Sequence, residues 1–282
     1  MSANKKLEKA ILKSLAYSGL FKYPLSFNQL GTYLGTKTTY SQLAKTLRKL
    51  EKKKKISQKQ GKYYLYRKQT VSWQKRYQTA QTKEKLARKV LRDLEKIPWI
   101  KMIALTGPLA AHNPGKKGDI DIFVIAKKNR LWLTRAFIVL YLKASKNYRT
   151  DKDPNNKVCP NLLISEENLE WKKDKRNLFI ASEIVRMQPI LNKSNTYERF
   201  LEANRWIQNF FPNFKFTKVE SKPKFNPSLL NLLEKWAFRL QKGYMQKKIT
   251  SEKVRPNKIH FNKNDISSDV MRRFKKEVKR LL

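Results

Sequence analysis

The chain has 282 residues, and its 64 lysines and arginines against 22 acidic residues give a formal net charge of +42. Such a charge favours a polyanionic partner, with nucleic acid first, although lysine spread evenly over a surface gives the same total. The single cysteine, Cys159, excludes an internal disulfide framework. There is neither a signal peptide nor an apolar run long enough to span a bilayer, so we expect a cytoplasmic protein with no membrane partner.

The first 70 residues have the pattern of three short helices followed by a hairpin. Apolar residues at helical spacing begin at Leu7, Ser26 is a suitable N-cap for a second helix, and a third helix is expected to begin at Thr39 or Tyr40. Two short apolar stretches around a glycine-bearing turn at residues 59–62 predict a wing. The block resembles the winged-helix DNA-binding superfamily.

This resemblance implies that the third helix enters a nucleic-acid groove while the wing contacts phosphates. The alternative is a winged helix that contacts protein or acts as a spacer, with its basic residues simply solvated. The candidate nucleic-acid-binding residues are Tyr40, Gln42, Lys45, Arg48, Lys49, Lys59 and Lys62.

Residues 103–125 carry the clearest chemical signal of the chain. An apolar strand ends at Gly107, a polar loop follows, and a second strand begins at Asp119. Because side chains alternate along a strand, Asp119 and Asp121 should share one face, about 6–7 Å apart. Neighbouring carboxylates repel unless they share a cation or a proton, and Mg²⁺ with phosphate oxygens is the usual answer. The alternative is a solvated strand start after a Gly-Lys-Lys-Gly turn.

The order of strand, glycine, spacer and Asp-x-Asp strand resembles the nucleotidyltransferase superfamily of DNA polymerase β, kanamycin nucleotidyltransferase and the minimal nucleotidyltransferases. The resemblance covers residues 98–170 and implies that Asp119 and Asp121 are catalytic and bind Mg²⁺. Pro108 departs from the family pattern, which has a serine that helps to hold the triphosphate. The nucleotide-binding candidates are Gly107, Pro108, Lys116, Lys117 and Arg135.

The family also places a third carboxylate on a later antiparallel strand, where it acts as general base or completes the metal site. The next expected strand, residues 158–164, offers Asn161, which cannot accept a proton. None of the acids before or after this strand is obviously in register. The third acid is therefore unassigned, and we expect Cys159 to be a small buried residue rather than a nucleophile.

We predict an α+β fold with a nucleotidyltransferase-like mixed sheet flanked by helices, an N-terminal winged helix and a helical C-terminal region. Within the last region a proline-bearing linker over 212–227 precedes helices over 228–248 and 266–282. The expected domains are the winged helix-turn-helix over residues 1–70, a linker helix over 71–97, the nucleotidyltransferase-like domain over 98–170 and the helical region over 171–282.

Two main functions remain open on the sequence. The first is a Mg²⁺-dependent nucleotidyltransferase that moves a nucleoside monophosphate from a nucleoside triphosphate to a hydroxyl acceptor, with nucleic acid favoured as the acceptor. The second is a catalytically degenerate winged-helix regulator of DNA or RNA that uses the nucleotidyltransferase fold as a sensor or scaffold. Pro108 and the unassigned third acid favour the second. A basic RNA-associated factor with an incidental acid pair is a third possibility.

Overall fold

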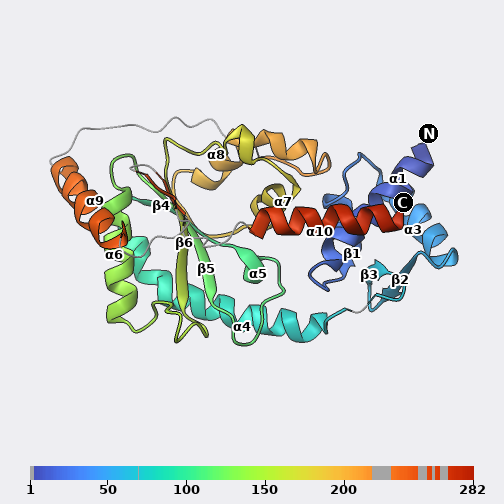
Figure 1. Cartoon of the computed structure of the whole chain (residues 1–282), viewed down its shortest axis with the longest axis horizontal. Helices are drawn as coiled ribbons and strands as arrows, with labels where there is room; N and C mark the ends of the chain where they lie inside the picture. The colour runs from blue at the N-terminus through green and yellow to red at the C-terminus, as the bar shows by residue number, and fades with distance from the viewer. Residues whose placement is uncertain (1–2, 69, 218–229, 247–252, 256–257, 261–265) are drawn as a thin grey trace.

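The computed structural model describes residues 3–68, 70–217, 230–246, 253–255, 258–260 and 266–282. These residues form a mixed α+β fold with a three-stranded and a six-stranded sheet. The small sheet and the N-terminal helices lie at one end of an elongated molecule, and the large sheet lies toward the other (Figure 1). No helix in the described part of the chain is both long enough and apolar enough to cross a bilayer.

The N-terminal unit contains three helices and the small sheet. Ser26 caps the second helix, as the sequence predicts, and forms a capping box with Gln29. The third helix begins at Tyr40, with Thr39 as its N-cap in a capping box with Gln42. Leucines at helical spacing on the third helix are buried in the core. The elements are α1 (Ala3–Gly19), β1 (Leu25–Ser26), α2 (Phe27–Thr32), α3 (Tyr40–Lys52), β2 (Ile56–Lys59) and β3 (Lys62–Leu65), with antiparallel strand order β1-β3-β2.

A long helix leads from this unit to the large sheet. It comprises α4 (Trp73–Leu91) and the short 3-10 helix η1 (Arg92–Lys96), which fits the expected linker helix. The sheet has the order β7-β4-β5-β6-β9-β8, in which only β5 and β6 are parallel. Its strands are β4 (Ile100–Leu105), β5 (Ile120–Ala126), β6 (Val158–Ser165), β7 (Gln188–Asn192), β8 (Lys253–Arg255) and β9 (Lys258–His260).

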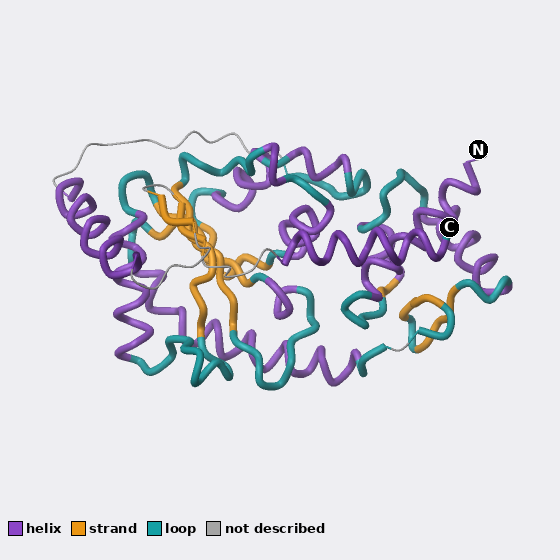
Figure 2. The backbone as a smooth tube through the Cα atoms, viewed as in Figure 1, coloured by secondary structure: helices purple, strands orange, loops and turns teal. Residues whose placement is uncertain are grey.

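Helices cover both faces of the large sheet, and the alternating side chains of β4 and β5 supply both cores. One core joins Ile103 and Val124 to α4 and to α6 (Leu131–Ala144), the helix that connects β5 with β6. The other joins Met102 and Phe123 to α7 (Leu178–Arg186), α8 (Thr196–Ala203) and the 3-10 helix η3 (Arg205–Asn209). Figure 2 shows the strands of the large sheet with helices on both sides of them.

Two more helices complete the described chain. Helix α9 (Leu230–Gln246) packs on α6, and the Glu234 carboxylate accepts hydrogen bonds from the backbone amides of Trp132 and Leu133 at 2.8 and 2.9 Å. This is a favourable position for an acid, because the first amides of a helix lack partners within the helix. Helix α10 (Ile266–Leu281) returns to the N-terminal unit and packs against α1 and α7 (Figure 1).

The region after residue 170 differs from the helical region expected there. It supplies three strands, β7, β8 and β9, which extend the large sheet at its two edges. Asn204 separates α8 from η3, and its side-chain amide donates to the carbonyls of Leu169 and Phe200. Most of the expected linker over 212–227 lies outside the described residues.

Candidate metal and nucleotide site

Two aspartates and the single cysteine meet where β5 begins. Asp119 immediately precedes β5, and Asp121 is its second residue, with Ile120 and Ile122 fully buried on the opposite face. Parallel pairing of β5 with β6 sets Asp121 beside Cys159. One carboxylate oxygen from each aspartate and the thiol sulfur all lie within 4.8 Å of one another. The alternation predicted from the sequence therefore does bring the two acids together.

The environment of this cluster opposes negative charge. Burial raises the pKa of Asp121 to about 7, and the neighbouring charges of Asp119 and Glu183 act in the same direction. Burial and the two aspartates also raise the pKa of the Cys159 thiol well above its ordinary value. The thiol therefore stays protonated at neutral pH, when it donates a hydrogen bond to Asp121. The oxygen atoms are the better ligands, and they fit a hard cation such as Mg²⁺.

A third carboxyl group near Asp121 comes from α7, and nothing in the sequence indicates it. Glu183 of α7 lies deep in the molecule, although part of the residue still reaches solvent. Burial raises its pKa, while Arg186 and the backbone amide of Gly107 favour its charged form. Glu183 is near enough to raise the pKa of Asp121 but is not part of the compact cluster with Cys159.

The strand expected to carry the third acid is β6, and it runs parallel to β5, not antiparallel. Its Asn161 lies at an irregularity in the pairing, between the positions opposite Ile122 and Phe123. The acids that flank β6 have other partners. Asp151 pairs with Arg149 and Asp153 with Lys157, whereas Glu166 and Glu167 pair with Arg199 and Lys128.

Gly107 brings the backbone close to the acid pair. Its φ is +60°, a conformation that residues with a Cβ atom rarely adopt, and an added Cβ would lie 3.1 Å from Oδ2 of Asp121. The amide of Thr106 also donates to the carbonyl of Asp121 at 3.0 Å. Pro108 follows at the start of the four-residue helix α5 (Gly107–Ala110) and has no N–H to offer a phosphate. A glycine is therefore required here, as the sequence pattern suggests.

Two basic residues of α4 hold the loop over 111–118. The Arg76 guanidinium donates to the carbonyl of Pro114 at 2.7 Å. The Lys83 ammonium, only 2% exposed at residue level, donates to the carbonyl of Gly118 at 2.7 Å and to the side chain of Asn156. Burial lowers the pKa of Lys83, whereas the charge of Asp119 opposes that shift. Lys83 gave no signal in the sequence because it resembles any other lysine of an amphipathic helix.

Arg149, like Glu183 and Lys83, is a functional candidate that the sequence does not reveal. Its Nε atom lies 3.4 Å from Oδ2 of Asp119, and its Nη1 atom is 2.7 Å from Asp151. Arg149 follows α6 in a loop, so only the folded chain places it at the acid pair. It supplies positive charge beside Asp119 that either balances the carboxylate or faces a bound anion.

The other nucleotide-binding candidates lie on the loop before β5 and on α6. Lys116 and Lys117 are exposed on the loop before Asp119. Arg135 lies on α6, where its guanidinium donates to Gln241 of α9 at 2.5 Å. This contact links α6 to α9.

The residues expected to bind nucleic acid divide into two groups. Gln42 caps α3, Lys49 pairs with Glu8 at 2.7 Å, and Lys62 is partly buried. The Lys62 ammonium contacts Gln29 at 3.1 Å and lies 5.1 Å from the centre of the Trp73 ring, and burial lowers its pKa. Tyr40, Lys45, Arg48 and Lys59 are exposed, and so are Gln42 and Lys49 despite the contacts just given.

A scan of the chain against protein-family models finds no match, and a search of curated proteins finds no significant sequence relative. The functional argument therefore depends on the residues and their geometry.

Proposed function

We propose that this protein is a Mg²⁺-dependent nucleotidyltransferase that moves a nucleoside monophosphate from a nucleoside triphosphate to a hydroxyl acceptor. The observation that carries the proposal is the compact group of Asp119, Asp121 and Cys159 beside the left-handed backbone of Gly107. Two carboxylates held this close in partly buried surroundings are more stable when a cation lies between them. Glycine at the adjacent turn keeps any side chain away from the Asp121 carboxylate.

The arrangement of the large sheet supports a nucleotidyltransferase-like domain. A buried strand, β4, leads into the glycine turn, and the Asp-x-Asp strand β5 lies antiparallel to it at the centre of the sheet. Helices flank both faces of this sheet. The three helices and small antiparallel sheet of residues 3–65 likewise support an N-terminal winged helix.

In this proposal Asp119 and Asp121 hold Mg²⁺ through their carboxylate oxygens. When bound, the metal offsets negative charge on the triphosphate and on its pyrophosphate leaving group. Lys116 and Lys117 add positive charge at the exposed loop, and Arg149 is placed to exchange its contact with Asp119 for one with a phosphate. Glu183 is the carboxyl group available to accept the acceptor's proton through a rearranged side chain or a water.

Nucleic acid is the acceptor class that the charge favours. The exposed residues Tyr40, Lys45 and Arg48 lie on one helix of the N-terminal unit, and Lys59 lies at its hairpin. Basic side chains of this kind bind phosphates without requiring a particular base sequence. The unit would then bring a DNA or RNA end to the large sheet.

A second candidate is a nucleic-acid-binding regulator without catalysis. Two observations favour it: Pro108 offers no N–H, and the amide of Gly107 already faces the Glu183 carboxylate. Both backbone positions that would hold a triphosphate are thus poor donors in this conformation. In that case the Asp119–Asp121 pair binds a cation for stability, or a nucleotide without turnover.

The two candidates differ in one measurable step. We would incubate the full chain with each labelled nucleoside triphosphate and Mg²⁺, with and without total tRNA, DNA or protein. The nucleotidyltransferase transfers label, and Asp121→Asn abolishes the transfer while Asp153→Asn, an exposed loop carboxyl paired with Lys157, retains it. Absence of transfer with every acceptor, together with retained nucleic-acid binding, would select the regulator.

A further inference from the structure

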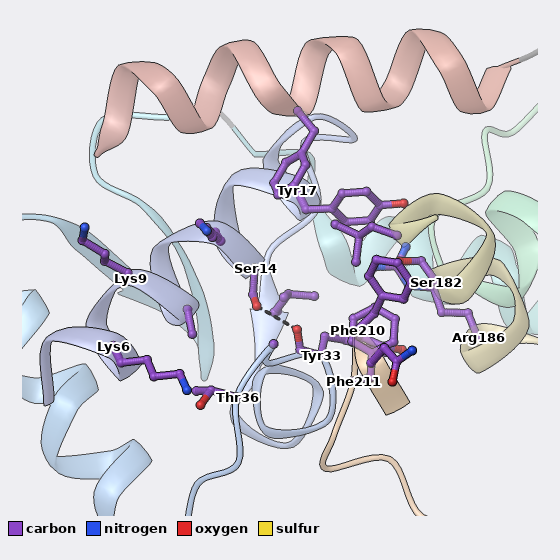
Figure 3. Close-up of a pocket in the computed structure, with 17 residues that line it drawn as sticks. Lys6, Lys9, Ser14, Tyr17, Tyr33, Thr36, Ser182, Arg186, Phe210 and Phe211 are labelled. Atoms are coloured by element: carbon purple, nitrogen blue, oxygen red, sulfur yellow. Dashed lines mark hydrogen bonds between the residues drawn. The ribbon is translucent and has the colours of Figure 1, made fainter. Parts of the chain in front are cut away.

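A cavity of about 320 Å³ lies between the N-terminal unit and α7, and neither Asp119 nor Asp121 lines it. Helix α1 forms one wall, and α10 crosses over the cavity (Figure 3). Much of the remaining wall is apolar, with Leu178 and Phe210 among its side chains. This volume is in the range of small-molecule sites, and apolar walls with a few polar groups are their usual composition.

The charged residues of this cavity all carry the same sign. Among the described residues that line it, Lys6, Lys9, Lys13 and Arg186 are cationic and none is acidic. The three lysines follow one face of α1 at helical spacing and are exposed. Lys6 and Lys9 lie at one end of the cavity and Arg186 at the other (Figure 3). A ligand that lies along the cavity therefore meets positive charge at both ends.

Arg186 is held in place by aromatic rings and not by an acid. Its guanidinium carbon lies 4.9 Å from the centre of the Tyr33 ring and 5.9 Å from that of Tyr17. Glu183 attracts it through space, but among the described residues no carboxylate lies within 4.0 Å of Arg186 and no hydrogen bond to it is formed. A planar group with five N–H donors, fixed in this way, matches a carboxylate or a phosphate.

Two buried hydroxyl groups lie at the same end. Tyr17 is 5% and Ser182 is 1% exposed, and their hydroxyls are close enough to interact with each other. Within the described part of the chain neither hydroxyl forms a well-aligned hydrogen bond with any other group. The two hydroxyls lie near each other and near Arg186 (Figure 3). Burial raises the pKa of Tyr17 to about 12, so its hydroxyl remains a donor at neutral pH. Buried polar groups are normally satisfied by hydrogen bonds, whereas these two hydroxyls have at most each other and line the cavity together with Arg186.

We propose that this cavity binds a small amphipathic anion. The carboxylate or phosphate head of the ligand contacts the Arg186 guanidinium and the hydroxyls of Tyr17 and Ser182. Its aromatic or aliphatic body lies against Leu178 and Phe210. The site does not depend on the proposed nucleotidyl transfer, since it shares no residue with the acid pair. Because α1 and α7 belong to different units of the fold, an occupant contacts both.

The test is calorimetric titration of the full chain with three ligands of one shape: naphthoate, naphthyl phosphate and the neutral naphthamide. Both anions are expected to bind at least about tenfold more tightly than the amide, because only they form charge-assisted hydrogen bonds with Arg186. The tighter of the two anions identifies the preferred head group. Equal binding of the anions and the amide, or binding of none of the three, would overturn the proposal.

Variants locate the binding. Arg186→Gln should weaken both anions by about tenfold and leave the amide unchanged. Arg67→Gln is the matched control, because Arg67 also lies over a tyrosine ring, that of Tyr66 at 5.3 Å, but is exposed and outside the cavity. If Arg186→Gln does not fold, Tyr17→Phe, which removes a hydroxyl whose one close polar neighbour is the Ser182 hydroxyl, should weaken the anions and keep the fold. If Arg186→Gln folds and binds the anions as tightly as the unmodified chain, the assignment is contradicted. If only Tyr17→Phe folds, unchanged anion affinity in that variant contradicts it.

Discussion

A Cβ atom added to Gly107 would lie 3.1 Å from the Oδ2 atom of Asp121, closer than real Cβ atoms normally approach a neighbour. The backbone of Gly107 also has a φ of +60°. The positions of the glycine and the acid therefore depend on each other, because a side chain at residue 107 would require the Asp121 carboxylate to shift.

Gly107→Ala should destabilise the protein by roughly 1–3 kcal/mol, because alanine is strained in a left-handed conformation. Displacement of Asp121 should also weaken cation binding. Thermal or urea unfolding measures the first effect. Gly19→Ala is the control, since Gly19 has open space around it and no positive φ, and it should leave stability nearly unchanged. Equal effects of the two changes would contradict the role of the glycine turn.

Asp121 should make stability fall as the pH rises through the mildly acidic range. Its pKa is about 7 in the folded chain against an ordinary value of 3.8, so between these values the folded state binds the extra proton. The unfolded state then holds fewer protons than the folded state, and the free energy of unfolding decreases with increasing pH. Each pKa unit corresponds to about 1.4 kcal/mol, so the loss by neutral pH amounts to a few kcal/mol.

Urea unfolding at a series of pH values, without divalent cations, measures this slope. Asp121→Asn should flatten it between about pH 4 and 7, with a residual slope from Glu183, whose pKa burial also raises. Asp153→Asn should leave the slope as it is. An unchanged slope in Asp121→Asn would show that the Asp121 carboxyl is ionised in the folded chain without difficulty.

Lys83 should contribute to stability through the loop that precedes Asp119. Lys83→Met removes two hydrogen bonds from a charged donor, to the Gly118 carbonyl and to the Asn156 side chain, at a cost of roughly 1–3 kcal/mol. Lys85→Met, on the same helix at an exposed position, should have little effect. Urea unfolding midpoints of the two variants measure the difference. A lower midpoint in Lys83→Met alone supports the specific contacts of Lys83, whereas equal midpoints would show that only the loss of a positive charge matters.

The structure separates two hairpin lysines that the sequence treats alike. Lys59 is exposed, whereas Lys62 contacts Gln29 and lies over Trp73. If the N-terminal unit binds nucleic acid, Lys59→Gln should lower affinity and reduce the slope of log K against log salt by about one. Lys62→Gln should leave that slope unchanged. Fluorescence anisotropy with labelled DNA and RNA over a range of salt concentrations measures both, and equal slopes would contradict the distinction.

Local signals in the sequence predicted local structure well. The Ser26 cap, the start of the third helix at Thr39 or Tyr40 and the alternation of Asp119 and Asp121 all depend on residues a few positions apart. What the sequence could not provide depends on pairing between distant segments. Strand β7 forms an edge of the sheet beside β4, although β5, α6, β6 and α7 all lie between these two strands in the sequence.

The same limit applies to the site. The position of Cys159 beside Asp121 requires the parallel register of β5 and β6, and Glu183 reaches the site from a helix on another layer. The lysine of α4 that supports the loop has no distinguishing motif. Sequence therefore located the acid pair, and the fold added the groups around it.

The central claim, that Asp119 and Asp121 together hold a divalent cation, is tested most directly by titrating Mn²⁺ into the full chain and measuring free Mn²⁺ by electron paramagnetic resonance. We expect saturable binding that Mg²⁺ displaces, with affinity at least about tenfold weaker in Asp121→Asn and unchanged in Asp153→Asn. Mn²⁺ binding of equal strength in Asp121→Asn and the unmodified chain, or no saturable binding in either, would contradict the claim.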